Sequence, residues 1–298
     1  MEGLRLRHLT CFVVVAQERT LARAAQRLHL SQPAVSKTLA ELEALAGRRL
    51  VERGRAGAQL TQAGEQFLRY AVDVTPAMES AAGALTRSGP PPAPAATVGA
   101  LPTVACGPLA QAIARLRLRR PYAGISVRTA SNPELLAALR AGEVDFAVGR
   151  IAEPAMMQGV SFELLYAESL AIVARPRHPL AGKILSPLAL LDYPLVIPGA
   201  GTAPRHNAEA FFQAHGIAVP RGCTETQSVS AARALTLLSD AVWITPQHAV
   251  QLDIDSGWLC RLSVPVPGGA EPVGLLRRSE ANLNELAELL MDILREVS

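Results

Sequence analysis

The sequence lacks the features that mark membrane-spanning and exported proteins. Its mean hydropathy is positive, at +0.20, but Pro, Gly and charged residues interrupt the apolar runs before they reach the ~20 residues of a membrane span. The apolar stretch from Thr10 to Ala16 is short and has no small-residue cleavage site after it, unlike a signal peptide. We therefore expect a cytoplasmic chain with no membrane partner.

The sequence also lacks the spacings that metal sites, redox centres and common enzymes require. None of the motifs G-x-S-x-G, G-x-x-x-x-G-K, H-E-x-x-H or G-x-G-x-x-G occurs, and the six histidines show no ligand spacing. The four cysteines are far apart and form no C-x-x-C pair: Cys11, Cys106, Cys223 and Cys260. We therefore expect reduced thiols, no metal, no cofactor and no enzymatic activity.

Charge is scarce but unevenly spread along the 298 residues, a length that suits two or three domains. Residues 1–70 hold eleven Lys or Arg against six Asp or Glu, whereas residues 91–298 hold seventeen against eighteen. The N-terminal excess indicates an anionic partner for the first 70 residues, although a solvated basic surface would have the same composition.

The first 50 residues show the pattern of three helices. A second, short helix is predicted over residues 21–28 with Thr20 as its N-cap. A tight turn leads to a third helix with Ser31 as N-cap and Gly47 as its stop. One face of the first helix is apolar at helical spacing: Leu6, Leu9, Phe12, Val13 and Ala16.

Two short helices joined by a tight turn form a helix-turn-helix, whose second helix enters the major groove of DNA. The exposed face of the third predicted helix is short, polar and free of acid near its start, as such a role requires. The following residues 48–61 predict a strand, a basic turn with Arg53 and Arg55, and a second strand. Such a wing suits contact with phosphates.

These residues resemble the winged helix-turn-helix of LysR-type transcriptional regulators. The matching signature is A-A-x-x-L-x-x-S-Q-P-A-V-S, then L-E-x-x-x-G, L-V-E-R and L-T-x-A-G, and it covers about 60 residues. The resemblance implies double-stranded DNA as partner. The candidate DNA-binding residues are Thr20, Arg23, Ser31, Gln32, Pro33, Ser36, Lys37, Arg53 and Arg55. Simpler interpretations stay open: Ser31 as a cap alone, Gln32 as a surface residue, and Arg53 and Arg55 as solvated charges.

The pattern stays helical from Thr61 to about Arg87. Pro76 should kink this helix or remove a hydrogen bond from it. An apolar stripe has no domain of its own to pack on, which favours a partner chain: Phe67, Ala71, Val74 and Met78. The family resemblance implies that the partner is the same helix of a second subunit. The Pro-rich stretch from Ser88 to Thr97 predicts an extended linker and the main domain boundary.

Strand and helix patterns alternate through the remaining 200 residues, which predicts an α/β fold with a largely parallel sheet. One helix is expected over residues 103–119. Extended segments near residues 160–175 and 262–278 suggest crossings between two lobes, each with its own sheet. In such folds ligands bind at the carboxyl ends of strands, beside helix N-termini.

This half resembles the two-lobed effector domain of LysR-type regulators, which is itself similar to periplasmic binding proteins. The segments VGALPT, LLAALRAGEVDFAVGR and FELLYAESLAIVARPRHPL are similar to the subgroup that regulates protocatechuate (pca operon) and related aromatic catabolism. The resemblance implies a small carboxylate inducer, a homodimer that forms a tetramer through its effector domains, and activation through RNA polymerase. The predicted domains are a winged helix-turn-helix over 1–62, a linker helix over 63–88, a hinge over 89–96, and an effector domain over 97–298, with lobe I at 97–168 and 266–298 and lobe II at 169–265.

The candidate effector-binding residues stand at strand ends and helix starts, where hydroxyl, amide and N–H groups meet. They are Thr103, Ser131, Asn132, Arg150, Thr202, Arg205 and Gln227. Arg150 could pair bidentately with a carboxylate. Helix capping is the alternative for Thr103 and Asn132, and a structural ion pair is the alternative for Arg150 and Arg205. Trp243 and Trp258 are interpreted as packing residues.

Two other functions share the α/β half. A solute-binding protein would have the same two lobes but would need an export signal and no DNA-binding head. An enzyme would need a catalytic motif, and none occurs. The first 65 residues therefore favour a ligand-responsive regulator of transcription.

Overall fold

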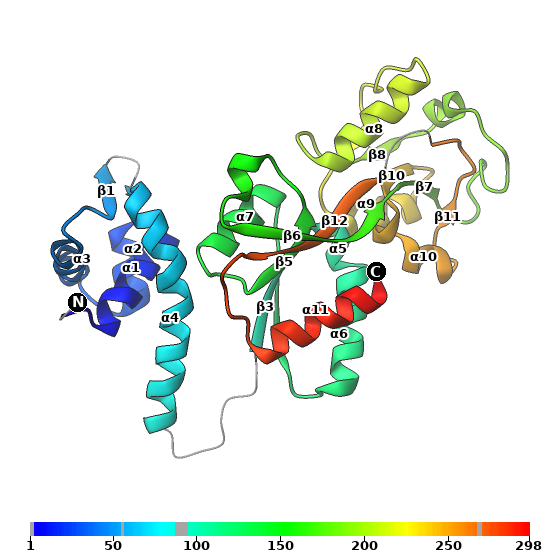
Figure 1. The fold of residues 1–298 in the computed structure, drawn as a ribbon. Coiled ribbons are helices and arrows are strands. Elements are labelled where there is room, and N and C mark those ends of the chain that lie inside the picture. Colours follow the sequence, from blue (N-terminus) through cyan, green and yellow to red (C-terminus); the bar gives the residue numbers. More distant parts are fainter. Residues whose placement is uncertain (1–2, 55–56, 87–94, 267–269) are drawn as a thin grey trace.

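The computed structural model describes residues 3–54, 57–86, 95–266 and 270–298. They form an N-terminal head, the long helix α4 (Gln62–Thr86) and two α/β lobes (Figure 1). Helix α4 lies between the head and the first lobe (Figure 1). Within the described residues, no helix combines the length and the apolar character needed to cross a membrane. The arrangement is the predicted winged helix-turn-helix, linker helix and two-lobed α/β domain.

The head consists of three helices and a two-stranded sheet: α1 (Leu6–Glu18), α2 (Leu21–Leu28), α3 (Gln32–Ala46), β1 (Val51–Gly54) and β2 (Gly57–Leu60). Helices α2 and α3 begin where the sequence predicts, because Thr20 and Ser31 each accept a 3.3 Å hydrogen bond from the N–H three residues ahead. Gly47 ends α3 in the left-handed conformation, with φ 64°.

The first half of α4 packs on the head, which corrects the expectation that its apolar stripe has no partner in its own chain. The Phe67 ring meets Phe12 of α1 edge-on at a centroid distance of 5.1 Å. Ala71 is only 1% exposed and belongs to the head's core. Val74 and Met78 stay 44% and 43% exposed. Only this later part of the stripe is free to contact another molecule.

Pro76 does not end α4, whose backbone remains helical on both sides of it. Most of the Pro-rich segment predicted between Ser88 and Thr97 lies outside the described residues. The first strand after it begins at Ala95.

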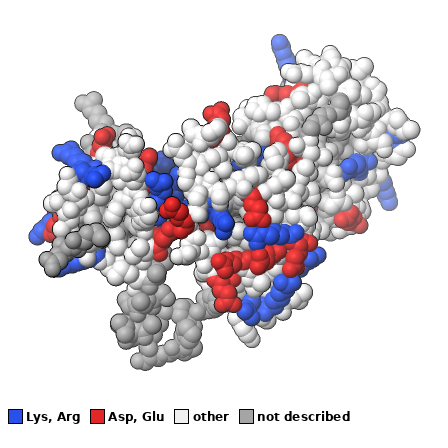
Figure 2. All heavy atoms as spheres, viewed as in Figure 1, with Lys and Arg blue, Asp and Glu red and all other residues white. Residues whose placement is uncertain are grey.

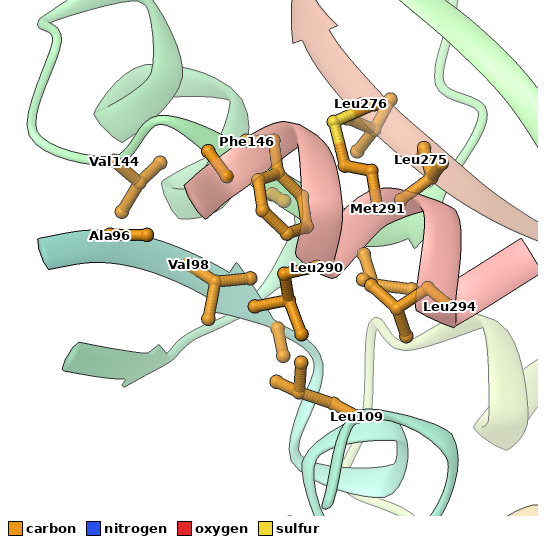
Figure 3. Packing of buried hydrophobic residues seen from close by; sticks show 14 of the residues in the cluster. Ala96, Val98, Leu109, Val144, Phe146, Leu275, Leu276, Leu290, Met291 and Leu294 are labelled. Atoms are coloured by element: carbon orange, nitrogen blue, oxygen red, sulfur yellow. The ribbon is translucent and has the colours of Figure 1, made fainter. Parts of the chain in front are cut away.

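The first lobe is built on a five-stranded sheet in the order β4-β3-β5-β12-β6. Its strands are β3 (Ala95–Ala100), β4 (Gly124–Thr129), β5 (Phe146–Arg150), β6 (Val160–Glu168) and β12 (Glu271–Arg278). Its helices are α5 (Pro102–Ala105), α6 (Pro108–Arg119), α7 (Asn132–Arg140), η1 (Pro154–Met157) and α11 (Glu285–Val297). Leu290 and Leu294 of α11 pack with Val98 and Phe146 of the sheet (Figure 3).

The second lobe has its own five-stranded sheet in the order β11-β7-β10-β8-β9. Its strands are β7 (Leu170–Ala174), β8 (Leu195–Ile197), β9 (Thr224–Glu225), β10 (Val242–Pro246) and β11 (Cys260–Arg261). Its helices are η2 (Pro187–Asp192), α8 (Ala203–Ala214), α9 (Val229–Leu238), η3 (Gln247–Ala249) and α10 (Gln251–Asp255). The chain enters this lobe after β6 and leaves it before β12.

Both sheets are mixed, whereas the sequence predicts a largely parallel arrangement. Strand β12 runs antiparallel to β5 and β6, and β7 runs antiparallel to β10 and β11. The antiparallel strands are those that begin or end beside the crossings between the lobes. Strand direction cannot be read from a run of apolar residues, because buried strands of either direction are apolar.

The helix predicted over residues 103–119 is divided into α5 and α6. Gly107 separates them, and a Cβ at Gly107 would lie 2.4 Å from the backbone oxygen of His248. Pro108 then opens α6, because a proline fits the first turn of a new helix but interrupts a continuing one. The break holds the short helix α5 apart from α6.

Candidate functional site

The start of α3 forms an exposed polar surface on the head. Gln32, Pro33 and Lys37 are exposed and Ser36 is half-buried, while Val35 faces the core. The first turn of α3 contains no acidic residue, so the positive end of its dipole is not neutralised there. The surface can therefore receive an anion beside groups that can reach base edges.

The neighbouring helix α2 starts on a similar pattern. Thr20 caps it, Arg23 is exposed in its first turn, and no acid lies there. The turn into α3 is tight because His29 adopts the left-handed conformation, with φ 53°. The helix-turn-helix thus has two helices, α2 and α3, whose first turns contain no acidic residue.

The wing is fixed to the helices by hydrogen bonds that backbone N–H groups in and beside its strands donate. The Glu43 carboxylate of α3 accepts hydrogen bonds from the N–H groups of Leu50 and Val51, at 2.8 and 3.0 Å. The N–H of Ala58 in β2 donates to the oxygen of Arg19 at 2.7 Å. Candidate Arg53 lies in β1, where its backbone pairs with Ala58.

The rest of the predicted wing turn lies outside the described residues, including candidate Arg55. The described strands β1 and β2 pair antiparallel in four-residue register. This strand pair is the described part of the predicted wing. Lys and Arg side chains appear on the outer surface of the head in Figure 2.

An open cavity of about 200 Å³ lies between the two lobes and is lined from both sides. Six of the seven predicted effector-binding residues line it: Thr103, Ser131, Asn132, Arg150, Thr202 and Gln227. The described lining contains no Asp or Glu, and Arg150 is its one charged residue. Helices α5, α7, α8 and α9 all begin at its wall. First-turn N–H groups and positive dipole ends therefore face a common space, which favours an anionic guest.

Several lining side chains already have partners within the protein. The Asn132 amide spans the backbone of Arg150, donating to its oxygen and accepting from its N–H, both at 2.9 Å. The Thr202 hydroxyl donates to the Gly199 oxygen at 2.8 Å and caps α8. The Ser131 hydroxyl donates to Glu134 at 2.6 Å. These three residues shape the cavity, but their polar groups are largely engaged in hydrogen bonds within the protein.

Thr103 and Gln227 are less committed. Among the described residues, no hydrogen bond engages the Thr103 hydroxyl or the Gln227 amide. Thr103 stands in α5 on one lobe, and Gln227 immediately precedes the N-cap Ser228 of α9 on the other. A ligand in the cavity would thus meet a hydroxyl from one lobe and an amide from the other.

Arg150 is held by a carboxylate, as its structural alternative predicted, while it also lines the cavity. Its Nε lies 2.7 Å from Oε2 of Glu271, although the two are not aligned as a hydrogen bond. The Arg150 side chain is 10% exposed. No described residue accepts from its terminal nitrogens. These nitrogens can serve a ligand carboxylate while Nε stays with Glu271.

Arg205 does not line the cavity and is the one predicted effector residue that the structure places elsewhere. Its guanidinium pairs with Glu209 at 2.7 Å and Glu225 at 2.9 Å and donates to the oxygen of Pro198. The hydrogen bonds that Arg205 donates to Glu225 and Glu209 raise the pKa of its guanidinium. It joins α8 to β9 within the second lobe.

Four further polar or aromatic residues line the cavity: Thr226, Ser228, Trp243 and Thr245. Sequence reasoning missed Thr226 and Thr245, and it interpreted Trp243 as a packing residue. Thr245 is 2% exposed and stands near the carboxyl end of β10. The signal that could have identified Thr245 was its position as a single hydroxyl residue near the end of an apolar strand. Trp243 both lines the cavity and packs in the core, whereas Trp258 is 62% exposed.

The cysteines are not activated. Burial raises the pKa of the Cys11 and Cys106 thiols to about 11 and also raises those of Cys223 and Cys260. A raised pKa lowers the thiolate fraction on which thiol chemistry depends. In the described part of the chain, no cluster of three His, Cys, Asp or Glu could hold a metal ion.

Comparison with protein families matches both halves of the chain. The family described as bacterial regulatory helix-turn-helix protein, lysR family, matches residues 6–65. The family described as LysR substrate binding domain matches residues 91–298. The head carries the first match, and the two lobes with their shared cavity carry the second.

Individual relatives match over almost the full length. The chain is 45% identical over 295 residues to the uncharacterized HTH-type transcriptional regulator YdcI of Escherichia coli K12, covering 99% of this chain and 96% of YdcI. It is 36% identical over 298 residues to the HTH-type transcriptional regulator PcaQ of Agrobacterium fabrum, covering 100% and 96%. The solved structure of a full-length OxyR variant from Pseudomonas aeruginosa covers 99% of both chains with a TM-score of 0.67 and 24% identity, which establishes a shared fold.

Proposed function

Because the chain belongs to the LysR family of bacterial transcriptional regulators, we propose that it activates an operon for the catabolism of an aromatic acid. Its signal is a small carboxylate bound between the lobes of the effector domain. The similarity to PcaQ at 36% identity supports the pca subgroup.

The observation that carries the proposal is the composition of the cavity wall. Arg150, the starts of four helices and the uncommitted Thr103 and Gln227 surround a space whose described lining contains no acidic residue. An apolar cavity of ~150 Å³ holds benzene. A space of about 200 Å³ therefore suits one ring, or its cleavage product, with one or two polar substituents.

Other ligand classes fit this wall less well. A neutral sugar would not need the charge of Arg150. A large hydrophobic ligand would need more aromatic lining than Trp243 provides. Peroxide sensing would need a reactive thiol, whereas burial raises the pKa of all four cysteines. A carboxylate uses both the charge and the helix starts.

In this proposal α3 reads DNA bases through Gln32 and Ser36, while Lys37, Thr20, Arg23, Arg53 and Arg55 bind phosphates. The exposed part of α4, with Val74 and Met78, pairs with its counterpart in a second subunit. A tetramer then forms through the effector domains, and RNA polymerase is the partner in activation. Closure of the lobes on the ligand shifts the spacing of the heads on DNA.

Thr103→Val tests the cavity most selectively, because it removes a hydroxyl and keeps the shape. Loss of a hydrogen bond to a charged partner costs roughly 1.5–3 kcal/mol. We therefore expect the variant to bind the carboxylate at least about tenfold more weakly. Calorimetric titration with aromatic acids, ring-cleavage dicarboxylates and matching neutral amides measures this difference.

Thr129→Val is the matched control, since Thr129 is an exposed threonine at the end of β4 in the same lobe, outside the cavity. It should bind like the wild type. The proposal fails if no carboxylate binds the wild type, or if Thr103→Val binds as tightly as the control.

A further inference from the structure

Helix α4, which packs on the head, contacts the first lobe of its own chain through a partly buried ion pair. Arg278, the last residue of β12, places Nη2 3.1 Å from the Asp73 carboxylate of α4. The two side chains are 11% and 24% exposed. Nη1 of Arg278 donates to the backbone oxygens of Leu139 and Val144, at 2.9 and 3.3 Å. One guanidinium therefore joins α4 to the end of α7 and to the segment just before β5.

Two further contacts reach the same end of α7. The Gln17 side chain of α1 donates from Nε2 to the oxygen of Ala141 at 2.8 Å. Gly142 lies so close to α4 that a Cβ there would be 2.8 Å from Cβ of Val72. Gly142 also has φ +67°, so a larger residue is excluded on two grounds. Figure 1 shows α4 along this side of the lobe.

The other end of α7 forms part of the effector cavity. Asn132, its first residue, lines the cavity and holds the backbone of Arg150 through two hydrogen bonds. The helix has nine residues, a length of about 13 Å. Its carbonyl end faces Arg278 and Gln17, and donors there are favoured by the helix dipole.

We infer that α7 is the element through which the effector cavity acts on the head of the same chain. Leu139, Ala141 and Gly142 form the docking surface for α1 and α4, and Arg278 is the positioning residue that holds them together. A ligand that displaces Asn132 or Arg150 would move α7 as a rigid helix, and the far end of α7 contacts α1 and α4. This regulation rests on the proposed function for its ligand, but the docking and the mechanical connection do not.

The double variant Gln17→Glu with Asp73→Asn tests the inference with almost no change of shape. It places a carboxylate against the Ala141 oxygen and removes the anion opposite Arg278, and the net charge is unchanged. The control is Gln213→Glu with Asp292→Asn, which makes the same two changes at exposed residues of α8 and α11. Retained binding to random-sequence DNA shows that the head is folded in both.

Hydrogen exchange of the full chain without any effector is the measurement. We expect exchange at residues 139–144 to rise on the order of tenfold in the double variant. The rise should extend to the cavity end of α7, at residues 132–135 and the N–H of Arg150. The control should match the wild type. Because no effector is present, a failure of the proposed ligand does not alter this outcome.

Unchanged exchange at residues 139–144 would overturn the docking surface. A rise confined to those residues, with the cavity end unaffected, would overturn the role of α7 as a connection. Exchange that rises equally in the control would likewise contradict the inference, since the effect would not come from the contact between head and lobe.

Discussion

Gln32 is the residue at which reading of DNA sequence is most directly tested. It is exposed in the first turn of α3, immediately after the cap Ser31. Loss of a good base contact costs roughly 1–3 kcal/mol. Gln32→Ala should therefore weaken operator binding by about tenfold while leaving binding to random DNA almost unchanged. Fluorescence titration with both DNAs measures the ratio.

Arg53→Ala provides the contrast. A phosphate contact acts on all sequences alike, so this variant should weaken binding to both DNAs and lower the salt slope by about one for each subunit bound. If Gln32→Ala behaves in the same way as Arg53→Ala, with equal loss on both DNAs, Gln32 does not read bases.

For single residues, the sequence predicted the place in the fold better than it predicted the hydrogen-bond and ion-pair partners. Thr103, Asn132 and Thr202 could be placed at the cavity because each follows a strand and starts or caps a helix. The sequence could not predict that the Asn132 amide hydrogen-bonds to the backbone of Arg150, because the two residues are 18 positions apart. Arg205 also lies at the start of a helix, but its partner Glu225 is distant in sequence and is brought to it only by the fold.

At the scale of elements, α4 has two parts with different roles. Ala71 is buried against the head, whereas Val74, three residues later, is 44% exposed. The stripe is continuous in sequence, and periodicity alone cannot show where one partner ends and the next begins. The structure assigns the first part to the head.

Substitution with Asp should separate the two parts of α4. Val74→Asp should leave the head folded and yield smaller species in sedimentation, because it introduces a charge only into the exposed part of α4 that we propose pairs with a second subunit. Ala71→Asp should unfold the head, since an unpaired buried charge costs several kcal/mol. Thermal unfolding with sedimentation distinguishes these results. A dimer of wild-type mass in Val74→Asp would place the subunit contact elsewhere.

Other elements show the same limit of sequence reasoning. Helices α2 and α3 were predictable to their ends because caps and a glycine stop are local signals. The separation of α5 from α6 depends on a close approach of Gly107 to His248, a residue of the other lobe. Pro108 was a local signal for the break, but the contact of Gly107 with His248 has no signature in the neighbouring sequence.

At the scale of the whole molecule, the chain combines a DNA-binding head with a two-lobed receptor. The cavity and the head meet opposite ends of α7 in the first lobe. We propose that ligand binding and DNA binding are coupled through this helix, and such coupling must act equally in both directions. The effector should change operator affinity, and operator DNA should change effector affinity by the same factor.

The most direct test of the account is operator binding measured against rising carboxylate concentration for the wild type and Thr103→Val. Without carboxylate, the two proteins should bind operator DNA equally. The carboxylate should alter binding of both, with a midpoint for Thr103→Val that is at least about tenfold higher. A carboxylate that changes operator binding of neither protein, or that acts on both at the same concentration, would contradict the account.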